Sequence, residues 1–392
     1  MMKIQSFIHS SATFVHLNVH YRAGVSSFRC DTMQLRHPAQ RKNNYSPLMM
    51  LSTSATEDDR SAGSSLAPRK FCIRSSENTA FRTIEDEIAS QYSIATVSKG
   101  ETSSESSYTH CIHILPYEYH SVQSYAIGIQ PLGTTASNSR RASRKKKKFT
   151  QMQPTFVDFC PPLSSNLGKR VGGQRQGGEM LLKAIAPAKY MNEKGGAIVY
   201  DLTAGFGQDS MILAAGKTAK VHIVERDPIV SLLLKDAMRR LHLITENVEE
   251  DRCHTLNNKL VLHEGDAVEF CKNRLNELNC KGESEGVAEA PDVCYLDPMF
   301  PPRTKSAAVK KNMQILHGLF QTNEGSGNDA DRRRQEQELL KEALALAKSR
   351  VVVKRPVNAP ALGTSSEVSC SSVPLPSFEL KGSINRFDIY IL

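Results

Sequence analysis

The pattern of apolar and polar residues divides the chain near residue 197. From there to the carboxyl terminus, short apolar runs alternate with longer segments in which apolar residues recur every three or four positions. Short apolar runs are typical of buried strands, and the longer repeat is typical of amphipathic helices. The predicted strands are 197–200, 219–225, 259–263, 292–296 and 350–354, and the predicted helices are 210–215, 227–243, 267–278, 306–320 and 335–348.

This alternation predicts an α/β fold with a doubly wound, mostly parallel sheet and right-handed crossovers. Residues 378–381 and 386–391 add the pattern of a terminal antiparallel hairpin. Upstream, strand-like segments surround a short helical pattern, which indicates a small α+β subdomain. We therefore expect three regions, which are a disordered extension at 1–69, the subdomain at 70–155 and the α/β domain at 156–392.

The first 50 residues contain six Lys and Arg side chains but one acid, Asp31, among many serines. A basic, serine-rich and acid-poor amino terminus is typical of an organelle transit peptide. We therefore expect a mitochondrial or plastid protein. The alternative is a cytoplasmic protein whose basic extension is disordered and has no targeting role.

Composition adds an expectation about partners. The 392 residues carry a formal net charge of +9, which favours an anionic partner such as nucleic acid. Residues 140–148 hold seven basic side chains in nine positions, a pattern that fits phosphate binding, a localisation signal or a solvated loop. The nine cysteines form no Cys-x-x-Cys pair, so we expect reduced thiols and no metal site. The sequence has no apolar run long enough for a membrane span.

A glycine loop follows the strand predicted at 197–200. Asp201 ends the apolar run, Gly205 and Gly207 stand two apart, and a helical segment begins soon after. Small residues let a ligand approach the backbone, and a helix start offers free N–H groups. The layout predicts a nucleotide-type site at the carboxyl end of a parallel strand.

Acids follow four of the predicted strands, namely Asp201, Glu225, Asp266 and Asp297. Glu225 comes about twenty residues after the glycine loop, the interval at which an acid accepts ribose hydroxyls. A pyrophosphate would be repelled by the additional acids, and the Gly-x-Gly-x-x-Gly spacing is absent. The set therefore fits S-adenosylmethionine (SAM) better than a dinucleotide. The alternative is that each acid caps a helix or pairs with a surface base.

Two further motifs carry candidate chemistry. The glycine-rich loop 168–178 holds Lys169, Arg170 and Arg175, which can pair with phosphates, but it lacks the end of a Walker A loop. The turn Asp297-Pro298-Met299-Phe300 resembles the Asn/Asp-Pro-Pro-Tyr/Phe motif of methyltransferases that act on exocyclic amines. We expect catalytic roles for Asp297, Pro298 and Phe300. A structural proline turn is the alternative.

Several segments together resemble the RsmJ family of class I methyltransferases, which modify the N2 amine of a guanosine in small-subunit ribosomal RNA. The similarity runs from about Phe156 to the end and more weakly back to Lys70. It is carried by Val157-Asp158-Phe159, Asp201-x-Thr-Ala-Gly-x-Gly-x-Asp209, Glu225-Arg226-Asp227-Pro228, Tyr295-Leu296-Asp297-Pro298-Met299-Phe300-Pro301, Lys305-Ser306-Ala307, Val309-Lys310-Lys311, Val351-Val352-Val353-Lys354-Arg355-Pro356 and Arg386-Phe387-Asp388-Ile389-Tyr390.

The resemblance implies a Rossmann-like domain, SAM as cofactor, and ribosomal RNA or the small ribosomal subunit as partner. It implies cofactor contacts at Gln208, Asp209, Glu225, Arg226, Asp266, Ala267 and Asp297. Gln208 departs from the family, which usually has Arg there. We expect RNA contacts at Lys169, Arg170, Arg175, Lys305, Lys310, Lys311, Lys354 and Arg355.

Other functions stay open at this stage. The same chemistry could act on an amine of DNA or protein. A protein with this fold could also have lost activity and serve as an RNA-binding assembly factor. A nicotinamide enzyme is a third alternative, and binding of NAD in place of SAM would support it.

Overall fold

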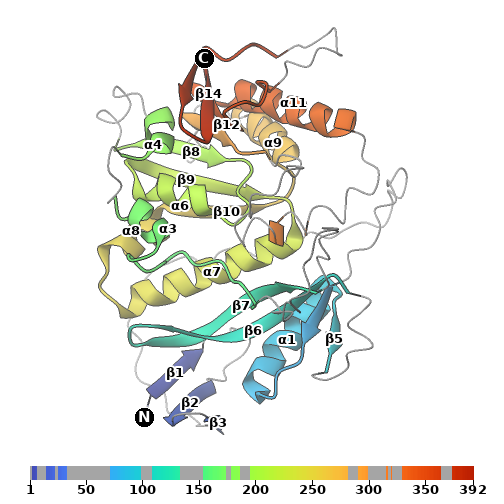
Figure 1. Cartoon of the computed structure of the whole chain (residues 1–392), viewed down its shortest axis with the longest axis vertical. Coiled ribbons are helices and arrows are strands. Elements are labelled where there is room, and N and C mark those ends of the chain that lie inside the picture. The colour runs from blue at the N-terminus through green and yellow to red at the C-terminus, as the bar shows by residue number, and fades with distance from the viewer. Residues whose placement is uncertain are drawn as a thin grey trace, which may run out of the picture.

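The structure is a computed structural model, and it describes residues 2–6, 15–22, 25–32, 71–98, 108–132, 153–173, 178–185, 195–280, 290–298, 315–316, 319, 329–362 and 373–392. A seven-stranded sheet forms its largest layer (Figure 1). In spatial order the strands are β10 (Leu260–Glu264), β9 (Thr218–Glu225), β8 (Ala197–Asp201), β11 (Val293–Leu296), β12 (Arg350–Pro356), β14 (Asn385–Ile391) and β13 (Phe378–Lys381).

Strand direction in this sheet fixes where a ligand site can lie. Strands β8 to β12 are parallel, and β14 pairs antiparallel with both β12 and β13. The chain moves outward from β8 through β9 to β10, and then returns to place β11 on the other side of β8. The carboxyl ends of β8 and β11 therefore meet at a topological switch point, where open α/β sheets bind ligands.

Helices cover both faces of the sheet, which confirms the doubly wound α/β fold with a C-terminal hairpin. On one face Val199, Val221 and Tyr295 pack with α6 (Gln208–Ala215) and α7 (Pro228–Asn247). On the other face Val224 and Leu296 pack with α9 (Ala267–Cys280) and α11 (Asp329–Leu346). Successive residues of a strand point to opposite faces, so continuous apolar runs are needed to fill both cores.

A four-stranded sheet forms the predicted α+β subdomain. Its order is β5 (Ala95–Val97), β4 (Phe71–Arg74), β6 (His110–Tyr119) and β7 (Val122–Pro131), and α1 (Thr79–Tyr92) follows β4. The β6–β7 hairpin lies alongside α7 (Figure 1). The Ile127 N–H donates to the buried Asp236 carboxylate of α7 at 2.8 Å, which ties the two units together.

Within the predicted extension 1–69, the structure describes residues 2–6, 15–22 and 25–32, and the predicted disorder stays a prediction. Strands β1 (Met2–Ser6), β2 (Val15–Arg22) and β3 (Val25–Thr32) form an antiparallel sheet. The segment Val15–Arg22 alternates apolar and polar residues, a period that suits a strand. Across the parts of the chain that the structure describes, no helix is long and apolar enough to cross a membrane.

One local feature also differs from expectation near the glycine-rich segment. Lys169 and Arg170 lie on α3 (Asn166–Val171), a short helix rather than a loop. The Ser165 hydroxyl caps this helix by accepting from the Gly168 N–H at 2.9 Å. Gly168 also lies against the Pro162 carbonyl, where a side chain would have no room. The helix α4 (Met180–Ile185) follows.

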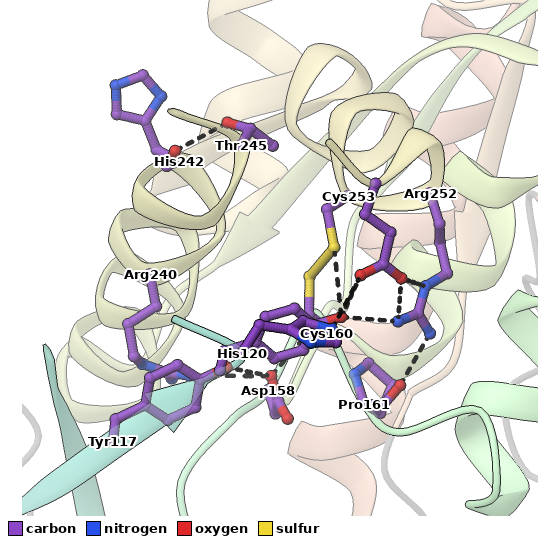
Figure 2. The surroundings of a disulfide bond; sticks show 12 residues. Tyr117, His120, Asp158, Cys160, Pro161, Arg240, His242, Thr245, Arg252 and Cys253 are labelled. Atoms are coloured by element: carbon purple, nitrogen blue, oxygen red, sulfur yellow. Dashed lines mark hydrogen bonds and ion pairs between the residues drawn. A yellow bond between two sulfur atoms is a disulfide. The ribbon is translucent and has the colours of Figure 1, made fainter. Parts of the chain in front are cut away.

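Cys160 and Cys253 form a disulfide, which contradicts the expectation that all cysteines are reduced thiols (Figure 2). The bond joins the segment after the subdomain to α8 (Asp251–Lys259). Arg252 donates to the Pro161 carbonyl at 2.8 Å beside it (Figure 2). The two cysteines are 93 residues apart in the sequence, so their spacing gave no sign of pairing.

Candidate active site at the carboxyl edge of the sheet

Asp201 is the buried acid at the base of the site. It is the last residue of β8 and is 1% exposed. The Ser210 hydroxyl donates to its Oδ2 at 2.5 Å, and the Thr203 N–H donates to its Oδ1 at 3.3 Å. Burial raises the pKa of Asp201 to about 7. The two hydrogen bonds join Asp201 to Thr203 in the glycine loop and to Ser210 in the helix after it.

The glycine loop turns through two left-handed residues. Gly205 has φ +53° and Gly207 has φ +66°, a region that residues with a side chain rarely adopt. Gly207 is the residue directly before α6, and a Cβ there would lie 3.0 Å from Phe159 and 3.1 Å from Leu234. Only glycine fits this tight turn, which brings backbone N–H groups to the edge of the sheet.

Glu225 ends the neighbouring strand β9 and is 6% exposed. Its Oε2 accepts from the Gly205 N–H at 2.9 Å, and its Oε1 accepts from the Asp227 N–H at 2.8 Å. Burial raises the pKa of Glu225 to about 7. The carboxylate is thus fixed against the glycine loop, where an acid can accept hydroxyls of a ribose.

The central feature of the site is one lysine between two aspartates. Lys354, on β12, donates to Asp209 Oδ2 at 2.6 Å and to Asp297 Oδ2 at 2.7 Å. Burial would lower the pKa of Lys354, but the two carboxylates outweigh it and raise that pKa, so the side chain is an ammonium. Burial likewise opposes ionisation of Asp209, yet Lys354 makes the pKa of Asp209 lower than usual.

Asp297 follows β11, and its side chain keeps 35% exposure. Its N–H donates to the Thr203 hydroxyl at 2.6 Å, which fixes the start of the Asp-Pro turn against the glycine loop. Burial raises the pKa of Asp297 above its ordinary value even with Lys354 beside it. Pro298 is buried directly after it.

Tyr295 and Thr203 belong to the motifs that carry the family resemblance, but the sequence predicted no role in the site for either residue. The Tyr295 hydroxyl donates to Asp209 Oδ2 at 2.7 Å, and burial keeps the pKa of Tyr295 well above its usual value. Tyr295 lies two residues before Asp297, so both point to the same side of the strand. That spacing is the signal that could have identified Tyr295.

Arg170 also reaches the site. Its guanidinium forms two hydrogen bonds with Glu179, at 2.9 and 2.7 Å, and lies 3.8 Å from Asp209 Oδ1. Glu179 directly precedes α4, so this pair joins the two ends of the glycine-rich segment beside Asp209. The predicted RNA contact of Arg170 stays a prediction, and its partners in the structure lie within the protein.

The remaining predicted cofactor contacts are Gln208, Arg226, Asp266 and Ala267. Gln208 begins α6, while Arg226 and Asp266 are exposed at the edge of the sheet. Asp266 accepts from the N–H groups of Val268 and Glu269 at the start of α9, the capping role that the sequence left as an alternative, and Ala267 is the buried first residue of that helix. Their cofactor contacts stay predictions.

Among the predicted RNA contacts, Lys169 is exposed. Arg355 is 6% exposed, and it donates to the Pro360 carbonyl at 2.9 and 3.1 Å and lies 3.8 Å from Glu336. Neither Lys354 nor Arg355 therefore gains direct support for a contact with the RNA backbone. The predicted residues Phe300, Arg175, Lys305, Lys310 and Lys311, and the basic block 140–148, lie outside the described residues.

The donor set suits a cationic cofactor. Asp209 and Asp297 share the ammonium of Lys354, and Asp201 lies near enough to both for their charges to raise its pKa. Carboxyl groups therefore outnumber this ammonium. The sulfonium and ammonium of SAM would be attracted to such a site, whereas a pyrophosphate would be repelled. Within the described ranges, no group of three or more His, Cys, Asp or Glu side chains is arranged to hold a metal ion.

Comparison with known proteins gives consistent matches. Residues 133–392 match the family described as "Putative SAM-dependent methyltransferase". The ribosomal RNA small subunit methyltransferase J of Pseudoalteromonas atlantica is 40% identical over 237 residues, 60% of this chain and 76% of the relative. The protein of the same name from Haemophilus influenzae is 37% identical over 265 residues, which are 67% of this chain and 84% of the relative. A solved SAM-dependent methyltransferase from Neisseria gonorrhoeae aligns with TM-score 0.48 and 23% identity, covering 82% of this chain and 95% of that chain.

These matches correct the predicted location. The curated relatives come from bacteria, which have neither mitochondria nor plastids, so the predicted organelle address is wrong. A basic, serine-rich composition does not by itself separate a transit peptide from another basic segment. The finding favours the alternative that the sequence left open, a protein with no organelle address.

Proposed function

We propose a substrate for this chain, which belongs to the family of SAM-dependent ribosomal RNA small subunit methyltransferases J. The proposed substrate is the exocyclic N2 amine of a guanosine in small-subunit ribosomal RNA, which the protein methylates. The observation that carries the proposal is the position of Asp297. It lies at the switch point of the sheet, its backbone is fixed by Thr203, and its carboxylate is 2.7 Å from the ammonium of Lys354.

The residues that would hold the cofactor surround the glycine loop. Glu225 fits the ribose hydroxyls because its carboxylate is fixed beside Gly205. Asp209 fits the methionine end because it is an ionised acid at the start of α6. When bound, SAM supplies a methyl group on a positively charged sulfur. The excess of carboxylates in the pocket favours this cation over an uncharged product.

The acceptor amine needs orientation more than it needs a strong base. The lone pair of N2 is conjugated with the guanine ring, so the amine is a weak nucleophile. An N2–H donated to the ionised Asp297 carboxylate would fix the direction of that lone pair. The nitrogen gains the methyl group and loses one proton, which Asp297 or water can accept. The 35% exposure of the Asp297 side chain leaves it accessible to an incoming base.

The direct test is methyl transfer from labelled SAM to small-subunit ribosomal RNA by the purified protein. Asp297→Ala should reduce transfer at least about 100-fold, because the amine loses its acceptor. Asp297→Asn, which keeps a carbonyl acceptor, should retain more activity than the alanine variant. Asp331→Ala removes an exposed acid of α11 and is the matched control, for which we expect wild-type transfer.

Three outcomes of this assay contradict the proposal. Near-normal transfer by Asp297→Ala would show that the catalytic turn is misassigned. SAM binding by the wild-type protein without transfer to any RNA would favour a non-catalytic assembly factor. Transfer to DNA or protein amines but not to RNA would keep the chemistry and change the substrate.

A further inference from the structure

Lys354 joins the two halves of the site. Asp209 comes from α6, which follows β8, whereas Asp297 follows β11 on the other side of the switch point. Lys354 lies on β12, next to β11, and its ammonium contacts both carboxylates. Its side chain is 21% exposed, and that of Asp209 is 14% exposed. The Lys354–Asp209 contact is therefore mostly shielded from water, whereas the Asp297 side chain keeps 35% exposure.

An ammonium shared by two carboxylates stabilises the ionised form of both. With Lys354 present, the three side chains sum to one negative charge. Without it, two like charges would lie close together, and the pKa of at least one carboxyl group would rise. A protonated Asp297 carries an O–H donor in place of an acceptor lone pair. Such a group presents the wrong polarity to an amine N–H.

We propose that Lys354 is a positioning residue that keeps the Asp297 carboxylate charged and aimed at the acceptor amine. The proposal rests on the proposed function, because it assigns Asp297 to the amine. It replaces the contact with the RNA backbone that the sequence predicted for Lys354. The ammonium bonds Asp297 through Oδ2, so the second carboxylate oxygen is the one offered to the amine.

The surroundings of Lys354 favour this role over a phosphate contact. Arg170 lies 3.8 Å from Asp209 Oδ1, but its guanidinium is already bonded to Glu179, so Lys354 is the nearer cation to Asp209. The Tyr295 hydroxyl donates to the same Asp209 oxygen as Lys354 does. Reaching an RNA phosphate would require Lys354 to leave two charge-assisted bonds of 2.6 and 2.7 Å.

The test compares Lys354→Met, which removes the charge, with Lys354→Arg, which keeps it. Lys217→Met is the control, because Lys217 is exposed and precedes β9 at the opposite edge of the sheet. The Asp carboxyl groups are titrated by carbon-13 NMR in each variant. We expect the apparent pKa values of the Asp209–Asp297 pair to rise by roughly one to three units in Lys354→Met. They should stay near wild type in the other two variants.

The same variants give a kinetic signature. In Lys354→Met the acidic limb of kcat/KM should move to higher pH by the same interval, so that activity falls on the acidic side of the profile and recovers as the pH is raised. Lys354→Arg should keep the wild-type profile. If the methionine variant does not fold, Lys354→Gln removes the charge while keeping a hydrogen-bond donor.

Unchanged carboxyl titration in Lys354→Met would overturn the proposal. A backbone contact predicts a different result, in which the salt dependence of RNA binding falls by about one unit of slope and the pH profile does not move. The positioning role predicts an unchanged slope. If the wild-type protein methylates no RNA, the proposed function fails, and the carboxyl titration still decides the role of Lys354.

Discussion

At the scale of single residues, burial sets the protonation of two acids that shape the glycine loop. Asp201 and Glu225 are 1% and 6% exposed, and burial raises the pKa of each to about 7. Each acid accepts hydrogen bonds that favour its charged form, but those bonds do not offset the loss of water. Near neutral pH, part of the population therefore carries a neutral carboxyl group beside the glycine loop.

This burial predicts a pH dependence of stability. The folded pKa of Glu225 is about 7, whereas its ordinary value is 4.5, so between these values the folded state binds the proton more tightly than the unfolded state. The free energy of unfolding should therefore decrease as pH rises, by up to about 1.4 kcal/mol per pH unit from this one group. Glu225→Gln should remove that part of the slope in urea denaturation between pH 5 and 6.5. An unaltered slope would contradict the prediction.

At the scale of elements, the turn before α6 positions Asp209. Gly207 holds a left-handed conformation with Phe159 and Leu234 packed against it. Asp209 lies two residues further on, in the first turn of α6, where the helix dipole favours a negative charge. The conformation of this turn therefore decides where the Asp209 carboxylate meets Lys354.

Two glycine substitutions separate backbone strain from packing. Gly173 has φ +70° with open space around it, whereas Gly207 has φ +66° in a packed turn. Gly173→Ala should cost about 1–2 kcal/mol of stability from backbone strain. Gly207→Ala should cost about 1–3 kcal/mol more from overpacking, and it should also weaken SAM binding. Denaturation and calorimetry of both variants check this, and equal losses in the two would refute it.

The strands of the seven-stranded sheet were predictable from sequence, because a strand that is buried on both faces requires an apolar run. The strands at 219–225 and 292–296 and the hairpin at 378–391 were all confirmed. Short or polar elements were missed. Strand Ala95–Val97 has three residues, and helix Asp251–Lys259 is mostly polar, so neither gives a periodic signal.

The site was predictable only in part. Acids at successive strand ends indicated Asp201 and Glu225, because parallel strands bring their carboxyl ends to one edge. The role of Lys354 was not predictable, because its partners Asp209 and Asp297 are 145 and 57 residues away. In the sequence of a basic protein, a lysine at the end of an apolar run suggests a phosphate contact. Only the fold shows that the neighbours of Lys354 are carboxylates.

At the scale of the whole molecule, a buried charge cluster joins the subdomain to the α/β domain. Asp236 on α7 accepts from the Ile127 N–H of β7 and from Arg240 at 3.0 Å. Both side chains of this ion pair are almost fully buried, and Arg240 also lies over the Tyr117 ring of β6. Because Asp236 accepts hydrogen bonds from both units, it fixes how the subdomain sits on α7.

Breaking this cluster should destabilise the whole protein. Asp236→Ala leaves the Arg240 charge buried without its partner, which should cost about 3–5 kcal/mol. Glu338→Ala breaks an exposed ion pair with Lys272 and is the matched control, with an expected cost of about 1 kcal/mol or less. Chemical denaturation measures both. A loss in Asp236→Ala no larger than in the control would contradict a structural role for the cluster.

The central claim is that this protein methylates the N2 amine of a guanosine in small-subunit ribosomal RNA. The most direct measurement is mass-spectrometric mapping of methylated nucleosides in that RNA, from cells with the protein, without it, and with only the Asp297→Ala variant. We expect one N2-methylguanosine that is present with the wild-type protein and missing in the other two. An identical set of methylated nucleosides in all three would contradict the account.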